Sequence, residues 1–160
     1  MYRLHVVQRL MSLRCRFDIS DAAGMPRYQA EGTIVRFPKR FTISTPTGVP
    51  VAQVTGRLAW LPTFDVTIGG VVVARIVKQL TLFRQRWSIH GTGITVVGDV
   101  WSMNFELHRG GYILGRVNKQ WISLRDRYDI EITNPADELL VLGIVLAIDY
   151  AKAQTSSASS

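Results

Sequence analysis

Residues 134–148 read Asn-Pro-Ala-Asp-Glu-Leu-Leu-Val-Leu-Gly-Ile-Val-Leu-Ala-Ile, and this stretch decides the fold. Asn134 is a residue type that caps helices, and Pro135 suits a first helical turn. The two acidic residues that follow complement the positive end of a helix dipole. Residues 139–148 are apolar on every side of such a helix, which leaves no polar stripe for solvent. We therefore expect a buried helix that the rest of the chain surrounds.

The rest of the chain repeats one strand-turn-strand pattern. Four clear copies occupy residues 6–19, 54–66, 76–89 and 117–130, and two looser copies occupy residues 28–45 and 95–107. Several of these segments alternate polar and apolar residues, as a sheet with one covered face requires. Six hairpins give twelve strands, and a barrel of twelve strands has a lumen that its own side chains do not fill. The sequence predicts an all-β dominated fold, a twelve-stranded closed antiparallel barrel around a central hydrophobic C-terminal α-helix.

Length and composition fit one folded domain. The chain has 160 residues, of which 47% are hydrophobic and 19% charged, so disordered and disulfide-stapled classes are excluded. We expect a single domain over residues 1–153 and a flexible Ser-, Thr- and Ala-rich tail over residues 154–160. The longest apolar run is about half of the roughly 20 residues that span a bilayer. We therefore expect no transmembrane segment. No secretory signal is visible, so we expect a cytoplasmic location, with a peripheral position at a membrane as an alternative.

Four phrases of the chain are informative in combination: residues 73–78 (Val-Ala-Arg-Ile-Val-Lys), 97–101 (Val-Gly-Asp-Val-Trp), 126–130 (Asp-Arg-Tyr-Asp-Ile) and 145–149 (Val-Leu-Ala-Ile-Asp). Together they resemble phrases of the LURP-one-related proteins. The resemblance covers most of the chain and implies the tubby C-terminal-like fold, a twelve-stranded barrel around a hydrophobic helix. Phospholipid scramblases and the phosphoinositide-binding tubby domains have related folds. The resemblance thus implies a role at membranes by analogy of fold alone.

The positive charges collect at one end of the expected barrel. Nineteen Lys and Arg residues against twelve Asp and Glu residues give a net charge of +7. If successive strands run up and down, the connections that follow odd-numbered strands share one end, and most cations lie there. The candidate residues for binding an anionic lipid or an acidic partner are Arg14, Arg16, Lys39, Arg40, Lys78, Arg84, Arg86, Lys119, Arg125 and Arg127. The candidate apolar interface residues in the same connections are Trp60, Phe83, Trp101 and Trp121.

Cations interleaved with aromatic residues have more than one interpretation. They are typical of a protein that lies on an anionic phospholipid surface. They are also typical of the residues that seal a barrel, with apolar side chains folded over the helix and Arg side chains at the rim, and large apolar residues are more often buried than exposed. An acidic protein partner is a further alternative. Nucleic acid is less favoured, because no known binding motif is present. The sequence gives no indication of the oligomeric state.

No residue pattern indicates catalysis. Asp18, Asp65 and Asp129 each follow the recurring aromatic residue, and we interpret them as outward-facing strand acids paired with neighbouring Arg. The three histidines lack metal-ligand spacing, and no Ser or Cys lies in a nucleophile turn. The Gly-Thr-Gly of residues 91–93 precedes a strand, so it is interpreted as a hairpin turn. A binding protein without catalytic residues, metal or cofactor is expected.

Overall fold

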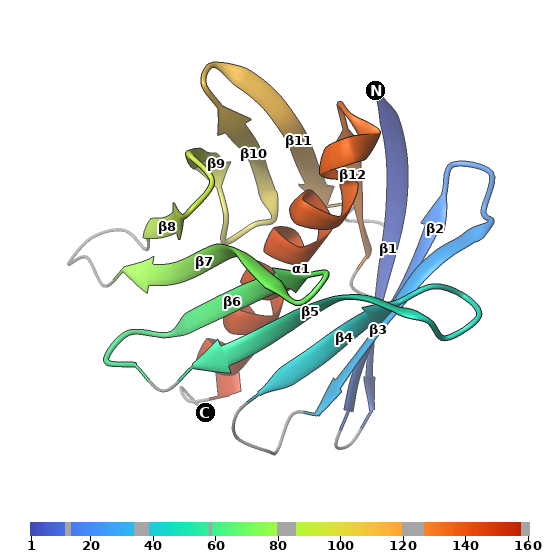
Figure 1. Cartoon of the computed structure of the whole chain (residues 1–160), viewed down its shortest axis with the longest axis horizontal. Coiled ribbons are helices and arrows are strands. Elements are labelled where there is room, and N and C mark those ends of the chain that lie inside the picture. The colour runs from blue at the N-terminus through green and yellow to red at the C-terminus, as the bar shows by residue number, and fades with distance from the viewer. Residues whose placement is uncertain (12–13, 34–38, 58, 80–85, 120–126, 158–160) are drawn as a thin grey trace.

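A computed structural model describes residues 1–11, 14–33, 39–57, 59–79, 86–119 and 127–157 of the chain (Figure 1). Within these residues the chain forms twelve strands and then a helix. The strands are β1 (Tyr2–Met11), β2 (Arg14–Asp21), β3 (Pro26–Thr33), β4 (Arg40–Ser44), β5 (Pro50–Arg57), β6 (Thr63–Ile68), β7 (Val71–Gln79), β8 (Arg86–His90), β9 (Ile94–Asp99), β10 (Asn104–Arg109), β11 (Tyr112–Lys119) and β12 (Arg127–Ile132). A short 3-10 helix (Pro135–Asp137) leads into α1 (Glu138–Ser157).

The strands form one antiparallel sheet that follows the order of the chain. From β1 to β8 and from β9 to β12 each strand pairs with the next, and β1 pairs with β12. The last pairing runs from Tyr2 opposite Ile132 to Val7 opposite Arg127. Across the seam between β8 and β9, no ladder of hydrogen bonds joins the described residues. The predicted twelve-stranded antiparallel barrel around a C-terminal helix is confirmed, and it is nearly closed.

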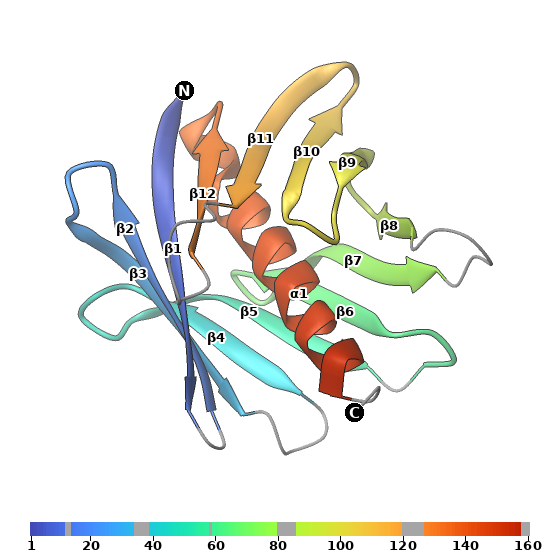
Figure 2. The same ribbon diagram turned by 180° about the vertical axis from the view of Figure 1, so that it is seen from behind.

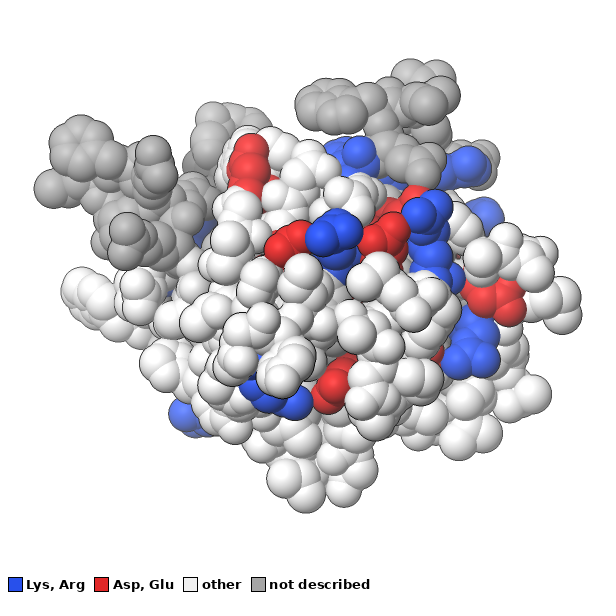
Figure 3. Space-filling model, turned by 90° about the horizontal axis from the view of Figure 1, so that it is seen from above, with Lys and Arg blue, Asp and Glu red and all other residues white. Residues whose placement is uncertain are grey.

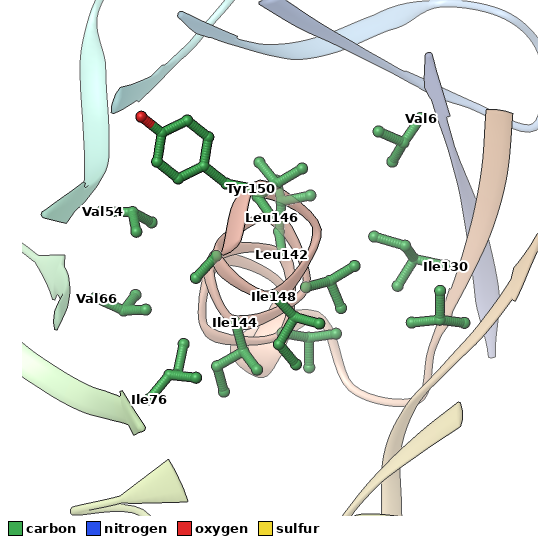
Figure 4. Close-up of a cluster of buried hydrophobic side chains, with 14 of the residues drawn as sticks. Val6, Val54, Val66, Ile76, Ile130, Leu142, Ile144, Leu146, Ile148 and Tyr150 are labelled. Atoms are coloured by element: carbon green, nitrogen blue, oxygen red, sulfur yellow. The ribbon is translucent and has the colours of Figure 1, made fainter. Parts of the chain in front are cut away.

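The helix α1 runs through the middle of the barrel (Figures 1 and 2). Residues 141–151 of the helix are all buried. Wall residues such as Val54, Ile76 and Ile130 point toward the helix from different sides (Figure 4). A helix that is apolar all round therefore contacts barrel wall all round. Asn134 caps the preceding 3-10 helix, because its Oδ1 accepts a hydrogen bond from the backbone N–H of Ala136 at 3.0 Å.

The helix extends further than the sequence indicates. It continues to Ser157, so residues 154–157 of the predicted tail are helical, and residues 158–160 lie outside the described residues. Two glycines allow close approach between α1 and the wall. A Cβ on Gly143 would lie 2.6 Å from Cγ1 of Val66, and a Cβ on Gly115 would lie 2.7 Å from Cγ1 of Val141. Side chains at these positions would push the helix away from β6 and β11.

Polar contacts fix the start of α1, and aromatic contacts fix its second half. Glu138 is buried and accepts hydrogen bonds from the hydroxyls of Tyr2 and Tyr28 and from the guanidinium of Arg27. At the other end of the barrel the ring of Tyr150 packs edge-on against two phenylalanines. Their ring centroids lie 5.4 Å away for Phe41 and 6.0 Å away for Phe64. The helix therefore runs from one mouth of the barrel to the other.

Candidate functional site: the basic end of the barrel

The basic end is the mouth of the barrel at which odd-numbered strands finish and even-numbered strands begin. The antiparallel order, which is interrupted at the seam between β8 and β9, brings these strand ends together. The described cations at this mouth are Arg14, Lys39, Arg40, Arg57, Lys78, Lys119, Arg127 and Lys152, and Arg57 is paired with Asp65. They include all four lysines of the chain. The lysines and the arginines at this mouth have different surroundings.

Three of the lysines lie over aromatic rings. The Nζ atom is 6.0 Å from the ring centroid of Tyr150 for Lys39, 5.9 Å from that of Trp87 for Lys78, and 5.7 Å from that of Trp101 for Lys152. Lys78 is only 4% exposed. Burial lowers the pKa of both Lys39 and Lys78. These contacts are of the cation–π kind, and they cover the mouth of the barrel with packed side chains.

The arginines of the barrel wall are neutralised by acids. Arg16, one of the predicted binding residues, has its Nε 2.8 Å from Asp18 and its Nη1 3.4 Å from Glu31. The other Arg–acid pairs within the sheet are Arg3–Glu131, Arg9–Asp18, Arg57–Asp65, Arg75–Asp65, Arg116–Glu106 and Arg116–Glu131. On the face drawn in Figure 3, cationic and anionic side chains accordingly lie next to each other. The wall therefore contributes little net charge.

The recurring strand acids take part in this neutralisation. The interpretation of Asp18 and Asp65 as outward-facing acids paired with Arg is confirmed. Asp129 lies beside a histidine, since its Oδ1 is 2.6 Å from Nδ1 of its cross-strand neighbour His5. In the described part of the chain, no three His, Cys, Asp or Glu side chains are placed to hold a metal ion together.

The exposed cations at the basic end are arginines. Arg14, Arg40 and Arg127 are exposed, and none has an ion-pair partner among the described residues. Trp60, in the connection between β5 and β6, is 99% exposed, and Trp101 is 56% exposed. The solvent-facing part of the basic end thus combines indole rings with guanidinium groups that have no acidic partner in the described part of the chain, while Lys39, Lys78 and Lys152 pack over aromatic rings.

Some predicted site residues cannot be placed in this arrangement. Arg84, Arg125, Phe83 and Trp121 lie outside the described residues. Arg86 begins β8, but its side chain is also outside the described part. Lys119 ends β11 and is half-buried.

Sequence reasoning missed that the lysines face inward. One signal was available for Lys78, because it continues the alternation of the buried residues Ala74 and Ile76 on the same strand. It also missed Lys152, which lies on α1 and reaches the basic end through the contact with Trp101. The apolar run of the helix stops before Lys152, so composition gave no reason to place it at the mouth of the barrel.

Comparisons with known proteins agree with this architecture. The family model described as LURP-one-related matches residues 2–149. The chain belongs to the LURP-one-related family, as the sequence phrases predicted. It is 25% identical over 102 residues to the uncharacterized protein YxjI of Bacillus subtilis (strain 168), and the aligned region spans 63% of each protein.

A solved structure shares the fold. The X-ray structure of a protein from Arabidopsis thaliana matches with a TM-score of 0.65, covering 92% of this chain and 90% of that one. The sequence identity is 12%, so this likeness concerns the fold alone. In the part of the chain that the structure describes, no helix has the length and apolarity needed to cross a bilayer.

Proposed function

We propose that the protein is a non-enzymatic binding protein that attaches to an anionic phospholipid surface through its basic end, on the cytoplasmic side of a membrane. The observation that carries the proposal is the contrast between wall and mouth. Wall arginines are paired with acids, whereas Arg14, Arg40 and Arg127 are exposed without an ion-pair partner in the described chain. Net positive charge is therefore concentrated where Trp60 is also exposed.

The chemistry of these side chains suits a membrane surface. Each Lys or Arg close to an anionic leaflet contributes about 1 kcal/mol of attraction. Indole rings prefer the level of the lipid headgroups, because one part of the ring is apolar and its N–H can donate a hydrogen bond. Three arginines and an exposed tryptophan at the same mouth can therefore supply both the electrostatic and the interfacial part of peripheral attachment.

The proposal is tested by cosedimentation of the purified protein with vesicles over a salt series. Neutral phosphatidylcholine vesicles are compared with vesicles that also contain phosphatidylserine. The triple variant Arg14→Gln/Arg40→Gln/Arg127→Gln is expected to bind anionic vesicles about 100-fold more weakly, from about 1 kcal/mol per cation. The matched control Arg3→Gln/Arg75→Gln/Arg116→Gln removes three charges from the wall and is expected to keep most of the binding.

Two results would contradict attachment through this end. An equal loss of binding in both triple variants would mean that net charge alone matters. Absence of binding to anionic vesicles by the unmodified protein would reject the membrane altogether. Salt-sensitive retention on an immobilised acidic protein, lost in the first triple variant only, would then favour the second candidate, a scaffold that docks an acidic protein partner.

A further inference from the structure

A shallow hollow lies on the outer wall at the edge of the basic end. It has a volume of about 230 Å³ and is lined by Arg14, Glu31, Gly32, Arg40 and Thr42. The hollow crosses β2, β3 and β4, which are consecutive neighbours in the sheet. The hollow therefore has Arg14 of β2 on one side, Arg40 of β4 on the other, and β3 between them.

The sheet register places the two arginines on either side of β3. Arg14 is opposite Thr33, and the pairing of Gly32 with Phe41 brings Arg40 level with Thr33 from the other side. Strands are spaced by about 4.8 Å, so the two Cα atoms are separated by roughly 10 Å. The neighbouring residues Cys15 and Phe41 are buried, so both arginines face outward. Two guanidinium groups can therefore converge on one group seated over β3.

The charge of the hollow distinguishes it from its neighbour along the wall. In the adjacent hollow lined by Arg9 and Arg16, both guanidinium groups lie 2.8 Å from Asp18 and are already neutralised. Arg14 and Arg40 have no such partner among the described residues. A ligand that supplies negative charge and several acceptor oxygens is thus complementary to the hollow lined by Arg14 and Arg40, and not to the hollow lined by Arg9 and Arg16.

The remaining lining residues specify what the anion is attached to. The carboxylate of Glu31 lies at 3.4 Å from Arg16 on one side of the hollow, and it can accept a hydrogen bond from a hydroxyl group. Thr42 adds a hydroxyl that can donate or accept. An inorganic dianion would be repelled by the carboxylate of Glu31. A phosphate ester whose carrier bears hydroxyl groups can place a hydroxyl beside Glu31 and its phosphate between the two arginines.

We propose that the hollow between Arg14 and Arg40 is a binding site for a phosphate monoester of a polyol, with the phosphate held by both guanidinium groups and a carrier hydroxyl held by Glu31. The inference rests on the proposed function, since at a membrane the ester would be a lipid headgroup. A phosphate monoester carries nearly two negative charges and three acceptor oxygens near neutral pH, so two arginines match it better than they match a singly charged diester.

A soluble probe tests the site without a membrane. Titration calorimetry of the full chain uses glycerol 3-phosphate, with glycerophosphocholine as the matched diester and inorganic phosphate as the phosphate group without a carrier. Glycerol 3-phosphate is expected to bind with saturation and more tightly than either control. Arg14→Gln and Arg40→Gln should each weaken it at least about tenfold, from the loss of a charged hydrogen bond. Arg127→Gln, with the same charge loss at the same mouth, should change it less than about twofold.

Vesicles then identify the source of the ester. Preference for phosphatidic acid over phosphatidylserine at matched surface charge, lost in Arg14→Gln/Arg40→Gln, assigns the site to a lipid headgroup. Saturable binding of glycerol 3-phosphate without that preference assigns it to a free ester. Absence of saturable glycerol 3-phosphate binding, or equal weakening by Arg127→Gln, overturns the site. Salt-sensitive binding to phosphatidylserine vesicles would still stand in that case, so failure of the site is distinguishable from failure of the proposed function.

Discussion

Among single residues, Glu138 fixes the first turn of α1 inside the barrel. Burial alone would raise the pKa of this carboxyl, but hydrogen bonds from Tyr2, Tyr28 and Arg27 outweigh burial and hold the pKa below its ordinary value. Burial and the bond to Glu138 together raise the pKa of Tyr28 to about 12. The hydroxyls therefore stay protonated and the carboxylate stays charged across the neutral range.

Because the folded pKa of Glu138 lies below the unfolded value, its carboxylate stabilises the fold above about pH 4.3. The stabilisation is lost as the pH falls through the folded pKa. We expect Glu138→Gln to lower the free energy of unfolding by about 2 kcal/mol at neutral pH and to flatten its decrease toward acid. Urea unfolding between about pH 3 and pH 7 measures both effects. Asp137→Asn, which alters the pair with Arg109 nearby, is the control and should retain the acid dependence.

The adjacent residues Lys39 and Arg40 separate sealing from binding. Lys39 lies over Tyr150 with a pKa lowered by burial, while Arg40 is exposed. We expect Lys39→Met to keep the unfolding free energy within about 1 kcal/mol, since methionine preserves an unbranched stem against the ring. Its binding to anionic vesicles should fall less than that of Arg40→Gln. A larger loss of binding from Lys39→Met than from Arg40→Gln would assign the lipid contact to the lysines.

The pKa of Lys39 also predicts a pH dependence with a definite sign. A lowered folded pKa means that the unfolded chain binds more protons between the folded value and about 10.4. Unmodified protein should therefore gain stability relative to Lys39→Met as the pH rises toward 10.4. Parallel denaturant titrations of the two proteins test this, and a difference that stays constant with pH would show that Lys39 is not desolvated.

At the level of elements, the contact between α1 and β6 depends on Gly143. Replacing an interior helical glycine by alanine ordinarily stabilises a helix by about 1 kcal/mol. Here the new Cβ would lie 2.6 Å from Cγ1 of Val66, so we expect Gly143→Ala to destabilise the protein by about 1–3 kcal/mol. In the double variant with Val66→Ala this penalty should largely disappear, which a double-mutant cycle measures. Additive effects of the two substitutions would place the clash elsewhere.

The sequence predicted most elements, and the deviations have physical causes. The capping residues and the apolar run of residues 134–148 located the helix. Residues 149–157 are more polar, so the hydrophobic pattern did not predict that the helix continues through them. The helix continues partly because Tyr150 and Ala151 are buried against the wall, which local propensity does not report. The glycines at 91 and 93 both have positive φ, as a tight turn requires. The hairpin interpretation of this turn was wrong, because β9 pairs with β10 and not with β8.

The candidate site was predictable in outline only. Strand alternation and an assumed up-and-down order predicted that most cations lie at one mouth. The prediction of a shared mouth succeeds because the order of strands in the sheet follows the order of the chain. Which cations are free depends on cross-strand neighbours and on what covers them. Arg16 is paired because Asp18 and Glu31 lie within reach, and Lys78 is covered because Trp87 lies opposite it in the register. Such contacts appear only when the register is known.

For the molecule as a whole, the proposed attachment fixes an orientation, with the mouth that carries Trp60 toward the lipid. Trp60 is 99% exposed in the free protein. Anionic vesicles are therefore expected to shift tryptophan emission to shorter wavelength, and lipids brominated in the upper acyl chain should quench it. Trp60→Phe should remove most of this response while vesicle binding persists through the arginines. An unchanged response in that variant would show that a different tryptophan enters the interface.

The pairing of β1 with β12 also has a consequence for synthesis. The two strands that join are the first and the last described strands along the chain, and the helix that fills the lumen follows both. On the ribosome, the inward-facing apolar residues of the early hairpins therefore lack their final partner until the helix has emerged from the exit tunnel. Closure of the barrel is a late event with high contact order. The nascent chain thus depends on rapid completion, or on a chaperone, to keep its incomplete sheet from associating with other polypeptide chains.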